Sequence, residues 1–410
     1  MQTKTIKFTI FNEDFWNKGL IYSQNFLPLI KLKENYPDKY KIEVHVFCSL
    51  LDIILYNREI FDFRQNFKKQ GIGSTIYPIF FVRSRLFVLR FFMLPFFYIN
   101  LIPYLLYINI KDIFYEKSAV IYHLRSYPVS LIFVMFYKAK GILIFDPRSD
   151  YVNENKTVGF WSENSISDKL WLFFENLILR NVSKTIFISK PFMHEILNRN
   201  NIEHNKEKHV VYYNSVDYEE FNISSQYKRN YETINFLYTG SLGNWNNLET
   251  YLDFFLNIRP FFNNSKLIVA TGTNRTKLEE VLMKDKYDSI LTSTEFFYNL
   301  SYDMLPELYK ECSVGLQIMN IEDSRLGVKF VEYLASGLLP VVNYNVLGSA
   351  EFCREGLGVI IERSDINDYK SIADKIKEKL NESLINNTLN SRKYFDVNIT
   401  YKNLNLIYNN

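Results

Sequence analysis

Short apolar runs alternate with longer amphipathic stretches along most of the chain. Two of these runs, TIKFTIF at 5–11 and IEVHVFCSL at 42–50, have the length and residue types of strands. Between them, the stretch 20–36 repeats apolar residues at helical spacing. Further runs of strand length lie at 119–124, 141–146, 184–189 and 209–213. Because strands that alternate with helices form parallel sheets covered on both faces, the first half is predicted to be an α/β domain.

The clearest helix of the first half is predicted at 165–182. Ser165 and Asp168 have the spacing of a capping box at its start. The apolar residues that follow at helical spacing are expected to form the face that packs on the core: Leu170, Phe173, Phe174, Leu177 and Ile178.

The second half of the chain restarts the same rhythm. Strands are predicted at 234–240, 266–270, 314–319 and 338–342, with a helix at 246–255. The stretch 217–232 between the two series is polar and lacks apolar periodicity, so it is expected to join two domains. Because 410 residues exceed the usual size of one core, we expect two doubly wound domains, the first over 1–217 and the second over 233–390.

Charge and cysteine usage narrow the class of protein. The chain has 48 basic and 45 acidic residues, a formal net charge of +3, which gives no overall footprint for nucleic acid. Cys48, Cys312 and Cys353 are scattered, which favours neither disulfides nor a zinc site and suits a reducing cytoplasm. The amino-terminal MQTKTIKFTIF has no long apolar stretch or small-residue cleavage site, so we expect no signal peptide.

The uncharged segment FFMLPFFYINLIPYLLYI at 91–108 reaches the length of a membrane span. Pro95, Asn100 and Pro103 interrupt it, which favours a buried helix or one that lies on a membrane surface. Basic residues beside aromatic ones suit an anionic bilayer, so membrane contact is expected over 80–110. The alternative is that the basic residues just upstream are only solvated: Arg83, Arg85 and Arg90.

In doubly wound sheets, ligands bind at the carboxyl ends of the strands, so the loops after the strands are the candidate sites. One such loop, NIEDSRLG at 320–327, leads into a helix predicted at 326–337. A turn of about 100° per residue puts Lys329, Glu332 and Ser336 together on one side of this helix. The opposite side is expected to face the core through Val328, Val331, Leu334 and Ala335.

The start of this helix has the chemistry of an anion site. Free backbone N–H groups and the helix dipole favour negative charge there, and Arg325 and Lys329 add two positive charges. Glu332 would accept hydrogen bonds from sugar hydroxyls such as those of ribose. The pattern favours a ligand with phosphate and sugar groups; the alternative is an exposed ion pair between Lys329 and Glu332.

The segment GVKFVEYLASGLLPVVN at 327–343 resembles the donor-site signature of retaining glycosyltransferases of family four. Those enzymes have two Rossmann-like domains facing a cleft, the GT-B fold. IFDPRSDYVNE at 144–154 is similar to a motif of capsule and lipopolysaccharide members. FDVNITYKNLNLIY at 395–408 resembles the helix that crosses back to the first domain, which we expect within 391–410. The other similar segments, in the expected order, are FISKPFMHEIL at 187–197, YYNSVDYEEF at 212–221 and INFLYTGSLGNWNNLE at 234–249.

The resemblance implies that the second domain binds a nucleotide-sugar, linked to UDP or GDP, with no cofactor. Lys329 would contact the diphosphate, Glu332 the ribose hydroxyls, and Ser241 would approach the phosphates. The other implied donor-binding residues are Gly19, Gly240, Gly272 and Arg325. No Asp-x-Asp pair is placed to hold a divalent ion, so we expect a metal-independent enzyme in which Lys329 stabilises the departing phosphate.

The resemblance also implies that the first domain binds the acceptor. Asp146 and Arg148 are expected to act in catalysis, with Glu154 on the same strand-end loop. The alternative is that Asp146 and Arg148 only shape that loop. His123 is a further catalytic candidate and Arg125 a further acceptor-binding one, although a near-core structural histidine is an alternative for the former. Trp16 is expected to stack on an acceptor ring, with core anchoring as the alternative.

Two departures from the family pattern keep other functions open. Ser324 stands where the family has the first glutamate of a Glu-x7-Glu pair, and SLGNWNN at 241–247 lacks the usual basic pair. The expected function is glycosyl transfer to a glycan or lipid-linked acceptor in bacterial surface polysaccharide synthesis, by a cytoplasmic protein peripheral on the inner membrane face. The alternatives are a nucleotide-sugar epimerase of the same fold and a non-catalytic scaffold.

Overall fold

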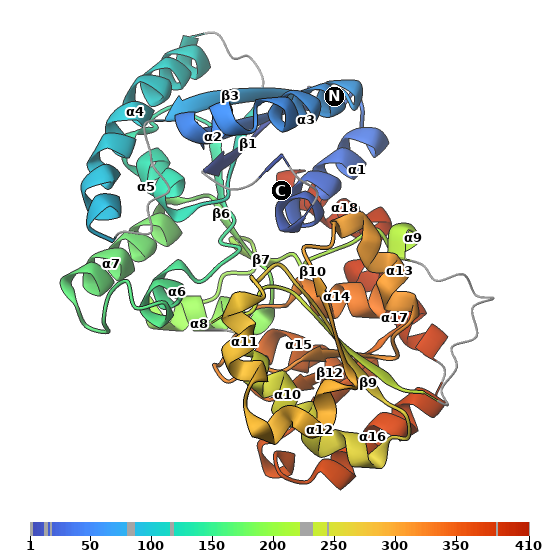
Figure 1. Cartoon of the computed structure of the whole chain (residues 1–410). Coiled ribbons are helices and arrows are strands. Elements are labelled where there is room, and N and C mark those ends of the chain that lie inside the picture. Colours follow the sequence, from blue (N-terminus) through green and yellow to red (C-terminus); the bar gives the residue numbers. More distant parts are fainter. Residues whose placement is uncertain are drawn as a thin grey trace. The chain divides into compact units, whose positions relative to one another are not determined.

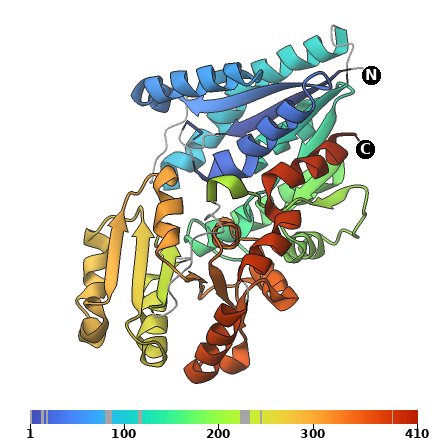
Figure 2. The same cartoon turned by 90° about the vertical axis from the view of Figure 1, so that its right-hand side faces the viewer.

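The computed structural model describes residues 3–11, 15–16, 19–79, 87–114, 119–221, 233–243, 246–382 and 384–409. The chain divides into two compact units, each with its own parallel sheet (Figure 1, Figure 2). The first unit consists of residues 1–188, 193–212 and 401–410, and the second consists of 189–192 and 213–400.

The sheet of the first unit has seven strands in the order β3-β2-β1-β4-β5-β6-β7, and every neighbouring pair is parallel. The strands are β1 Lys4–Phe11, β2 Tyr40–Ser49, β3 Gly73–Ile79, β4 Val120–Leu124, β5 Ile142–Phe145, β6 Lys184–Phe187 and β7 His209–Val211. The strands predicted in this half are confirmed. β3 is an addition that the pattern did not indicate, because GSTIYPI contains a proline and only Ile79 in it is buried.

Helices cover both faces of this sheet. A π-helical turn, Tyr22–Phe26, runs directly into α1 Leu27–Asn35, so the helix predicted at 20–36 is confirmed. The others are α2 Leu50–Leu55, α3 Asn57–Lys69, α4 Phe87–Phe114, α5 Tyr127–Phe136, α6 Tyr151–Thr157, α7 Ile166–Asn181 and the end of α8 Lys190–Arg199. The second half of α18 Val397–Asn409 completes the unit.

Ser165 caps α7 as predicted, but the Asp168 carboxylate accepts from the Asn164 N–H and not from Ser165, so the capping box is only half formed. The predicted apolar face is wrong for most of its residues, although Ile178 is buried. The Ser165 hydroxyl accepts a hydrogen bond from the Asp168 N–H at 3.2 Å. Leu170 is 45% exposed and Phe173 62% exposed, so neither packs on the core. The buried residues of the helix are Asp168, Trp171, Glu175, Ile178 and Leu179. The pattern misled because Glu175, which is fully buried, counts as polar in a sequence and shifts the apparent apolar face.

The apolar segment at 91–108 forms part of the long helix α4. Past residue 100, its buried side chains recur at helical spacing: Leu101, Tyr104, Leu105 and Ile108. Within the described part of the chain, no helix has the length and apolar character needed to cross a membrane. Arg83, Arg85 and the side chain of Arg90, which were expected to face a bilayer, lie outside the described residues.

The second unit holds a six-stranded parallel sheet in the order β10-β9-β8-β11-β12-β13. Its strands are β8 Asn235–Thr239, β9 Lys266–Thr271, β10 Thr294–Tyr298, β11 Val314–Gln317, β12 Leu339–Asn343 and β13 Val359–Ile361. Its helices are α9 Tyr218–Phe221, α10 Leu248–Ile258, α11 Thr276–Leu282, α12 Asp288–Leu291, α13 Leu305–Lys310, α14 Val328–Ala335, α15 Leu347–Phe352, α16 Tyr369–Asn381 and α17 Leu384–Phe395. The strands and the helix predicted in this half are confirmed.

The helix predicted at 326–337 is α14, and its predicted polar side is wrong. Every residue of α14 except Lys329 is buried, including Glu332, which is 1% exposed. Ser336, which follows the helix, is also buried. The helix has two apolar faces because it packs on the sheet with one side and on α17 and α9 with others. The exposed ion pair considered as an alternative is therefore excluded in that form, since the carboxylate lies in the interior.

Each sheet reverses its strand order once. In the first unit the chain moves outward from β1 to β3 and then returns to place β4 on the other side of β1. In the second unit the same reversal lies between β8 and β11. Loops at the carboxyl ends of the strands diverge at such a reversal, which makes it the usual ligand position in open α/β sheets. The architecture therefore offers one candidate site in each unit.

Candidate active site

In the first unit, a buried polar cluster lies at the reversal between β1 and β4. His123 is on β4, and Asp146 follows β5 directly. The His123 Nε2 lies 2.9 Å from Asp146 Oδ2, and its Nδ1 lies 2.6 Å from the Tyr408 hydroxyl. Arg148 donates from Nε to the same carboxylate, 2.9 Å from Oδ2 and 2.8 Å from Oδ1. Three predicted residues, His123, Asp146 and Arg148, are thus brought together.

The charges of this cluster are set by burial and pairing. Burial lowers the pKa of His123, because the interior disfavours the imidazolium, and this outweighs the attraction of Asp146. Burial alone would raise the pKa of Asp146, but the Arg148 guanidinium and the His123 hydrogen bond lower it to about 2. At neutral pH the cluster therefore holds an ionised carboxylate, a neutral imidazole and a guanidinium. Both ring nitrogens of His123 have partners in the protein, which fixes the ring and lets it orient Asp146.

Arg125 joins the cluster through the π-helical turn after β1. Its guanidinium donates to Asn25 Oδ1 and, at 3.2 Å, to Gln24 Oε1. Asn25 in turn lies 3.4 Å from Asp146 Oδ2 through its Nδ2. π-helical turns are rare and frequent at functional sites, and this one turns two amides inward. Sequence reasoning missed Gln24, Asn25 and Tyr408. The signal for the first two was an unusual run of polar residues, SQN, within an apolar helix, and Tyr408 had none.

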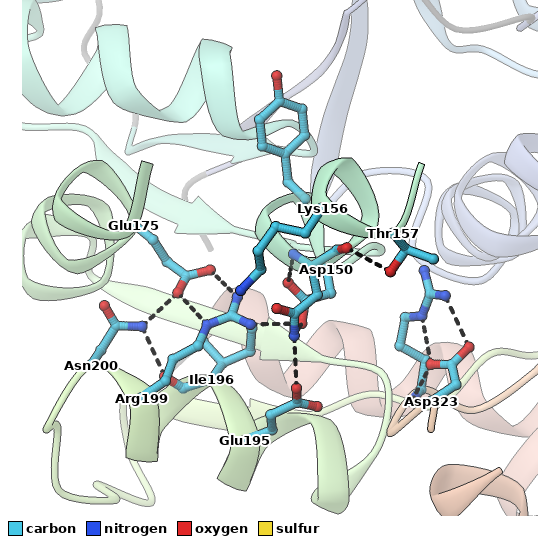
Figure 3. A network of polar contacts seen from close by, with 12 residues as sticks. Asp150, Lys156, Thr157, Glu175, Glu195, Ile196, Arg199, Asn200 and Asp323 are labelled. Atoms are coloured by element: carbon cyan, nitrogen blue, oxygen red, sulfur yellow. Dashed lines mark hydrogen bonds and ion pairs between the residues drawn. The ribbon is translucent and has the colours of Figure 1, made fainter. Parts of the chain in front are cut away.

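A second network fixes the end of the loop that carries Asp146. Figure 3 shows Arg199 of α8 lying between Glu175 of α7 and Asp150, which begins α6. The guanidinium donates at 2.7 Å both to Glu175 Oε1 and to Asp150 Oδ2. The Tyr127 hydroxyl donates to the other Glu175 oxygen at 2.8 Å. Asp150 also caps α6 by accepting from the Asn153 N–H.

Burial by itself would lower the pKa of Arg199, but Glu175 and Asp150 raise it far above its usual range. The guanidinium is therefore a permanent charge that ties α6, α7 and α8 together. Because α6 starts at the end of the loop after β5, this network fixes where that loop ends. Asp146 and Arg148 fix where it begins.

The other candidates of the first unit lie elsewhere around the same edge. Glu154 is half buried on α6. Trp16 stacks on Tyr56 at 4.6 Å between ring centroids and touches Phe15 edge-on. A Cβ at Gly19 would meet no protein atom within 4 Å, so space inside the protein does not require a glycine there. The ligand roles of Glu154, Trp16 and Gly19 stay predictions.

In the second unit, Glu332 anchors a buried polar chain at the reversal between β8 and β11. Its Oε2 accepts from Lys329 Nζ and from the Tyr309 hydroxyl, both at 2.8 Å. The Tyr309 hydroxyl lies 3.1 Å from Thr239 Oγ1, and Tyr333 contacts the same threonine at 3.3 Å. Thr239 is the last residue of β8, so the chain connects α14 to the carboxyl end of the central strand. Lys329 is 31% exposed and forms its outer end.

The loop before α14 is held by residues from the segments that resemble the family. Ser189 donates from its hydroxyl to the Ser324 carbonyl at 2.5 Å, and Asn214 donates to the Leu326 carbonyl at 2.6 Å. Arg325 forms a two-pronged pair with Asp323, at 2.8 Å and 2.9 Å. A donor phosphate at Arg325 would therefore share the guanidinium with Asp323, a partner that the sequence did not reveal.

Two glycines shape the edge of the second unit. Gly240 has φ +142°, a region that side chains rarely adopt, and a Cβ there would lie 3.1 Å from the Tyr238 hydroxyl. That hydroxyl donates to the carbonyl of Ser241, whose side chain is exposed after β8. Gly272 follows β9, where a Cβ would make only ordinary contact with Asn299. The structure thus gives a conformational reason for Gly240; the donor contacts of all three stay predictions.

A comparison with known protein families finds a match over part of the chain. Residues 219–398 match the family of glycosyl transferases group 1. This region contains Gly240, Ser241, Gly272, Arg325, Lys329 and Glu332. No curated protein sequence matches the chain.

Solved structures resemble the chain over its whole length. Anabaena Alr3699/HepE in complex with UDP has a TM-score of 0.69 at 14% identity, covering 98% of this chain and 99% of that one. A glycosyltransferase from Rickettsia africae has a TM-score of 0.65 at 14% identity, covering 100% and 99%. The lipopolysaccharide outer core galactosyltransferase WaaB has a TM-score of 0.65 at 14% identity, covering 98% and 99%. At these identities the likeness shows the fold: two Rossmann-like domains, as in GT-B proteins.

Proposed function

We propose that the protein is a glycosyltransferase that moves a sugar from a nucleotide-diphosphate sugar to a glycan or lipid-linked acceptor. The observation that carries the proposal is the pair of Lys329 and buried Glu332 at the start of α14. It lies at the strand-order reversal of a region that matches glycosyl transferases group 1. Transfer by the retaining route of family four, with a capsule or lipopolysaccharide product, is part of the proposal.

The pair is suited to holding a nucleoside diphosphate. An ammonium group has three donors, and Lys329 spends one on Glu332, which leaves others for phosphate oxygens. The free N–H groups at the start of α14 are further donors for an anion, and the helix dipole adds positive charge there. Glu332 keeps one carboxylate oxygen beyond the Oε2 that Lys329 and Tyr309 occupy, and that oxygen is the proposed acceptor for ribose hydroxyls.

The proposed transfer needs charge stabilisation more than acid–base chemistry. As the bond from the sugar to the diphosphate breaks, negative charge develops on the leaving phosphate. Preorganised donors aimed at that charge are usually the largest catalytic contribution. We assign this role to Lys329 and the α14 N-terminus, without a metal ion or cofactor. HepE has been solved with UDP and with UDP-glucose, which favours UDP as the nucleotide to try first.

The first unit is the proposed acceptor side. Asp146 is fully buried and committed to Arg148 and His123, so we assign it a positioning role. Arg148 and Arg125 are the cations that it helps to place, and they would orient acceptor hydroxyls or stabilise departing charge. This arrangement supports the loop-shaping alternative for Asp146 together with a direct role for the arginines.

We also propose that the protein works on the inner face of the cell membrane, where lipid-linked acceptors are held. The support is the exposed apolar side of α4 beyond residue 100. Six large side chains there are 38% to 74% exposed: Ile102, Leu106, Tyr107, Ile110, Ile113 and Phe114. A helix with buried residues on one side and exposed apolar ones on the other suits the bilayer interface.

Calorimetric titration of UDP and GDP tests the donor site. Wild type is expected to bind one of them, and Lys329→Ala to lose about 1–3 kcal/mol, as expected for a charge-assisted contact. Lys379→Ala is the matched control, because Lys379 also pairs at 2.8 Å with a glutamate three residues on, but that glutamate follows α16 and is 49% exposed. Equal binding by wild type and Lys329→Ala would remove the proposed phosphate contact.

Two other functions predict different results. Ser324 in place of the family's first glutamate favours a non-catalytic scaffold, which would bind neither nucleotide. An epimerase would bind the nucleotide and convert its sugar without an acceptor. Mass spectrometry of the sugar products, with and without a lipid-linked glycan, separates the epimerase from the transferase.

A further inference from the structure

A groove on the first unit has the lining of a carbohydrate site. It lies between α3 and the segment after β1 and has a volume of about 440 Å³, within the usual range for small-ligand sites. Its aromatic lining consists of Phe15, Trp16, Tyr22, Phe63 and Phe67. These rings brace one another: Phe15 meets Trp16 and Phe63 edge-on, each at 5.0 Å between centroids. Phe15, Phe63 and Phe67 are buried core residues, so Trp16 and Tyr22 are the rings of this lining that keep exposed surface.

A polar stripe along α3 forms another part of the lining. Glu59, Asp62, Asn66 and Lys69 are all exposed and form this stripe. At about 100° per residue they fall within an arc of about 80° on the helix, beside the arc of the buried Phe63. From the first to the last they span about 15 Å of helix, enough for more than one sugar ring. The groove thus combines aromatic side chains with hydrogen-bonding groups.

Several side chains of the polar stripe are available for hydrogen bonds to a ligand. Among the described residues, no side-chain hydrogen bond or ion pair is formed by Glu59, Asp62 or Asn66. The lining itself has two carboxylates, Glu59 and Asp62, against the single ammonium of Lys69, while α3 also carries Arg58, Arg64 and Lys68 outside the lining. The carboxylates in the lining accept hydrogen bonds from hydroxyls and repel a phosphate or an acidic sugar placed directly against them. The charge therefore separates this groove from the donor site, which is built around cations.

We propose that this groove binds uncharged or amino-substituted pyranose rings of the acceptor glycan. This inference deepens the proposed function. It rests on that function, because only a glycosyltransferase would have an acceptor glycan to bind. The apolar face of a pyranose would stack on Trp16 or Tyr22, and its hydroxyls would bond the carboxylates of α3. A nucleotide is the poorer occupant, because its phosphates would meet Glu59 and Asp62.

Saturation-transfer NMR on the full chain tests the groove directly. The probes are methyl β-glucopyranoside, N-acetylglucosamine and glucuronic acid, each with UDP present as a second ligand. We expect ring protons of the two uncharged sugars to receive saturation, and glucuronic acid to receive much less. Asp62→Asn, which keeps the shape of the groove, is expected to weaken sugar binding about tenfold, the usual worth of a hydrogen bond to a charged group. Trp16→Ala is expected to abolish it.

Asp374→Asn is the matched control, because it also removes an exposed helical carboxylate, but on α16 in the second unit. Its sugar binding should equal that of wild type. The proposal is overturned if no uncharged sugar binds wild type, if glucuronic acid binds best, or if Asp62→Asn and Trp16→Ala both bind like wild type. UDP binding reports on the proposed donor site in the same samples. If wild type binds UDP but no sugar, only the groove proposal is wrong. If wild type does not bind UDP, the proposed transferase function is itself contradicted.

Discussion

At the scale of single residues, Asp146 is the position on which the first candidate site depends. It is fully buried and satisfies its charge through Arg148 and His123. Asp146→Asn would leave the buried Arg148 without its carboxylate, and removing one partner of a buried pair costs about 3–5 kcal/mol. Urea unfolding measures the loss. Glu295→Gln is the control, because its pair with Lys266 is exposed and its loss should cost far less stability. Similar losses in both variants would contradict the buried pairing.

His209 makes a residue-scale prediction about acid. Its Nε2 is buried without a hydrogen-bond partner in the described structure, and burial, with Lys208 and His204 nearby, lowers its pKa to about 4. Below pH 6.5 the unfolded chain binds this proton more readily than the folded one, so stability is lost as pH falls from about 6.5 to 4. In His209→Gln, the free energy of unfolding should fall less steeply over that window. Equal slopes in wild type and His209→Gln would contradict the prediction.

Much of the residue-level site lies beyond the reach of sequence patterns. The pattern located Asp146, Arg148, Lys329 and Glu332 because strand ends of a doubly wound sheet can be read from apolar runs. It could not supply their partners. Tyr408 reaches His123 from 285 positions away, and Tyr309 reaches Glu332 from 23 positions before it. Neither spacing has a period, so only the fold brings these groups together.

At the scale of elements, buried polar networks explain why strands were easier to predict than helix faces. β1 has six consecutive buried residues, as central parallel strands do, and therefore appears as one apolar run. α7 buries Glu175 and exposes Phe173, which reverses the expected pattern. β13 has only three residues, too few to carry a periodic signal.

The network around Glu175 predicts an element-scale effect of Arg199. Arg199→Lys keeps the charge but loses the planar fork that bonds Glu175 and Asp150 together. We expect a loss of about 1–3 kcal/mol in stability and faster hydrogen exchange in α6, whose cap is Asp150. Hydrogen-exchange mass spectrometry measures the latter. Arg180→Lys on α7 is the control, because Arg180 bonds only the exposed side of that helix through Asn176. Unchanged exchange in α6 would show that the network does not hold this helix.

At Gly348, α15 packs closely against the backbone of the loop before α14. A Cβ at Gly348 would lie 2.4 Å from the carbonyl carbon and oxygen of Arg325, which are backbone atoms that cannot turn aside. Gly348→Ala should therefore displace the loop, at a cost of about 1–3 kcal/mol, and weaken nucleotide binding. Gly243→Ala, where a Cβ meets nothing within 4 Å, should change stability by less than about 0.5 kcal/mol. Chemical denaturation of both variants gives the comparison, and a well-tolerated Gly348→Ala would mean that the loop yields.

At the scale of the whole molecule, two cores in one chain predict separable unfolding. The end of α18 belongs to the first unit, where Tyr408 is 1% exposed and bonds His123. Tyr408→Ala should destabilise that unit by about 3–5 kcal/mol, through lost packing and the lost hydroxyl. The stability of the second unit should not change, because its core clusters do not include Tyr408. In calorimetry one transition should therefore move to lower temperature while the other stays.

UDP should act on the transition that Tyr408→Ala leaves in place. A ligand that binds only the folded donor unit raises the stability of that unit by mass action, about 2.7 kcal/mol at a hundredfold excess over its Kd. The control is Leu406→Ala, which changes an exposed side chain two residues away and should move neither transition. If UDP instead shifts the transition that Tyr408→Ala lowers, the nucleotide binds the first unit, and the assignment of donor and acceptor sides must be exchanged. A single transition that responds to both changes would mean that the two units unfold as one.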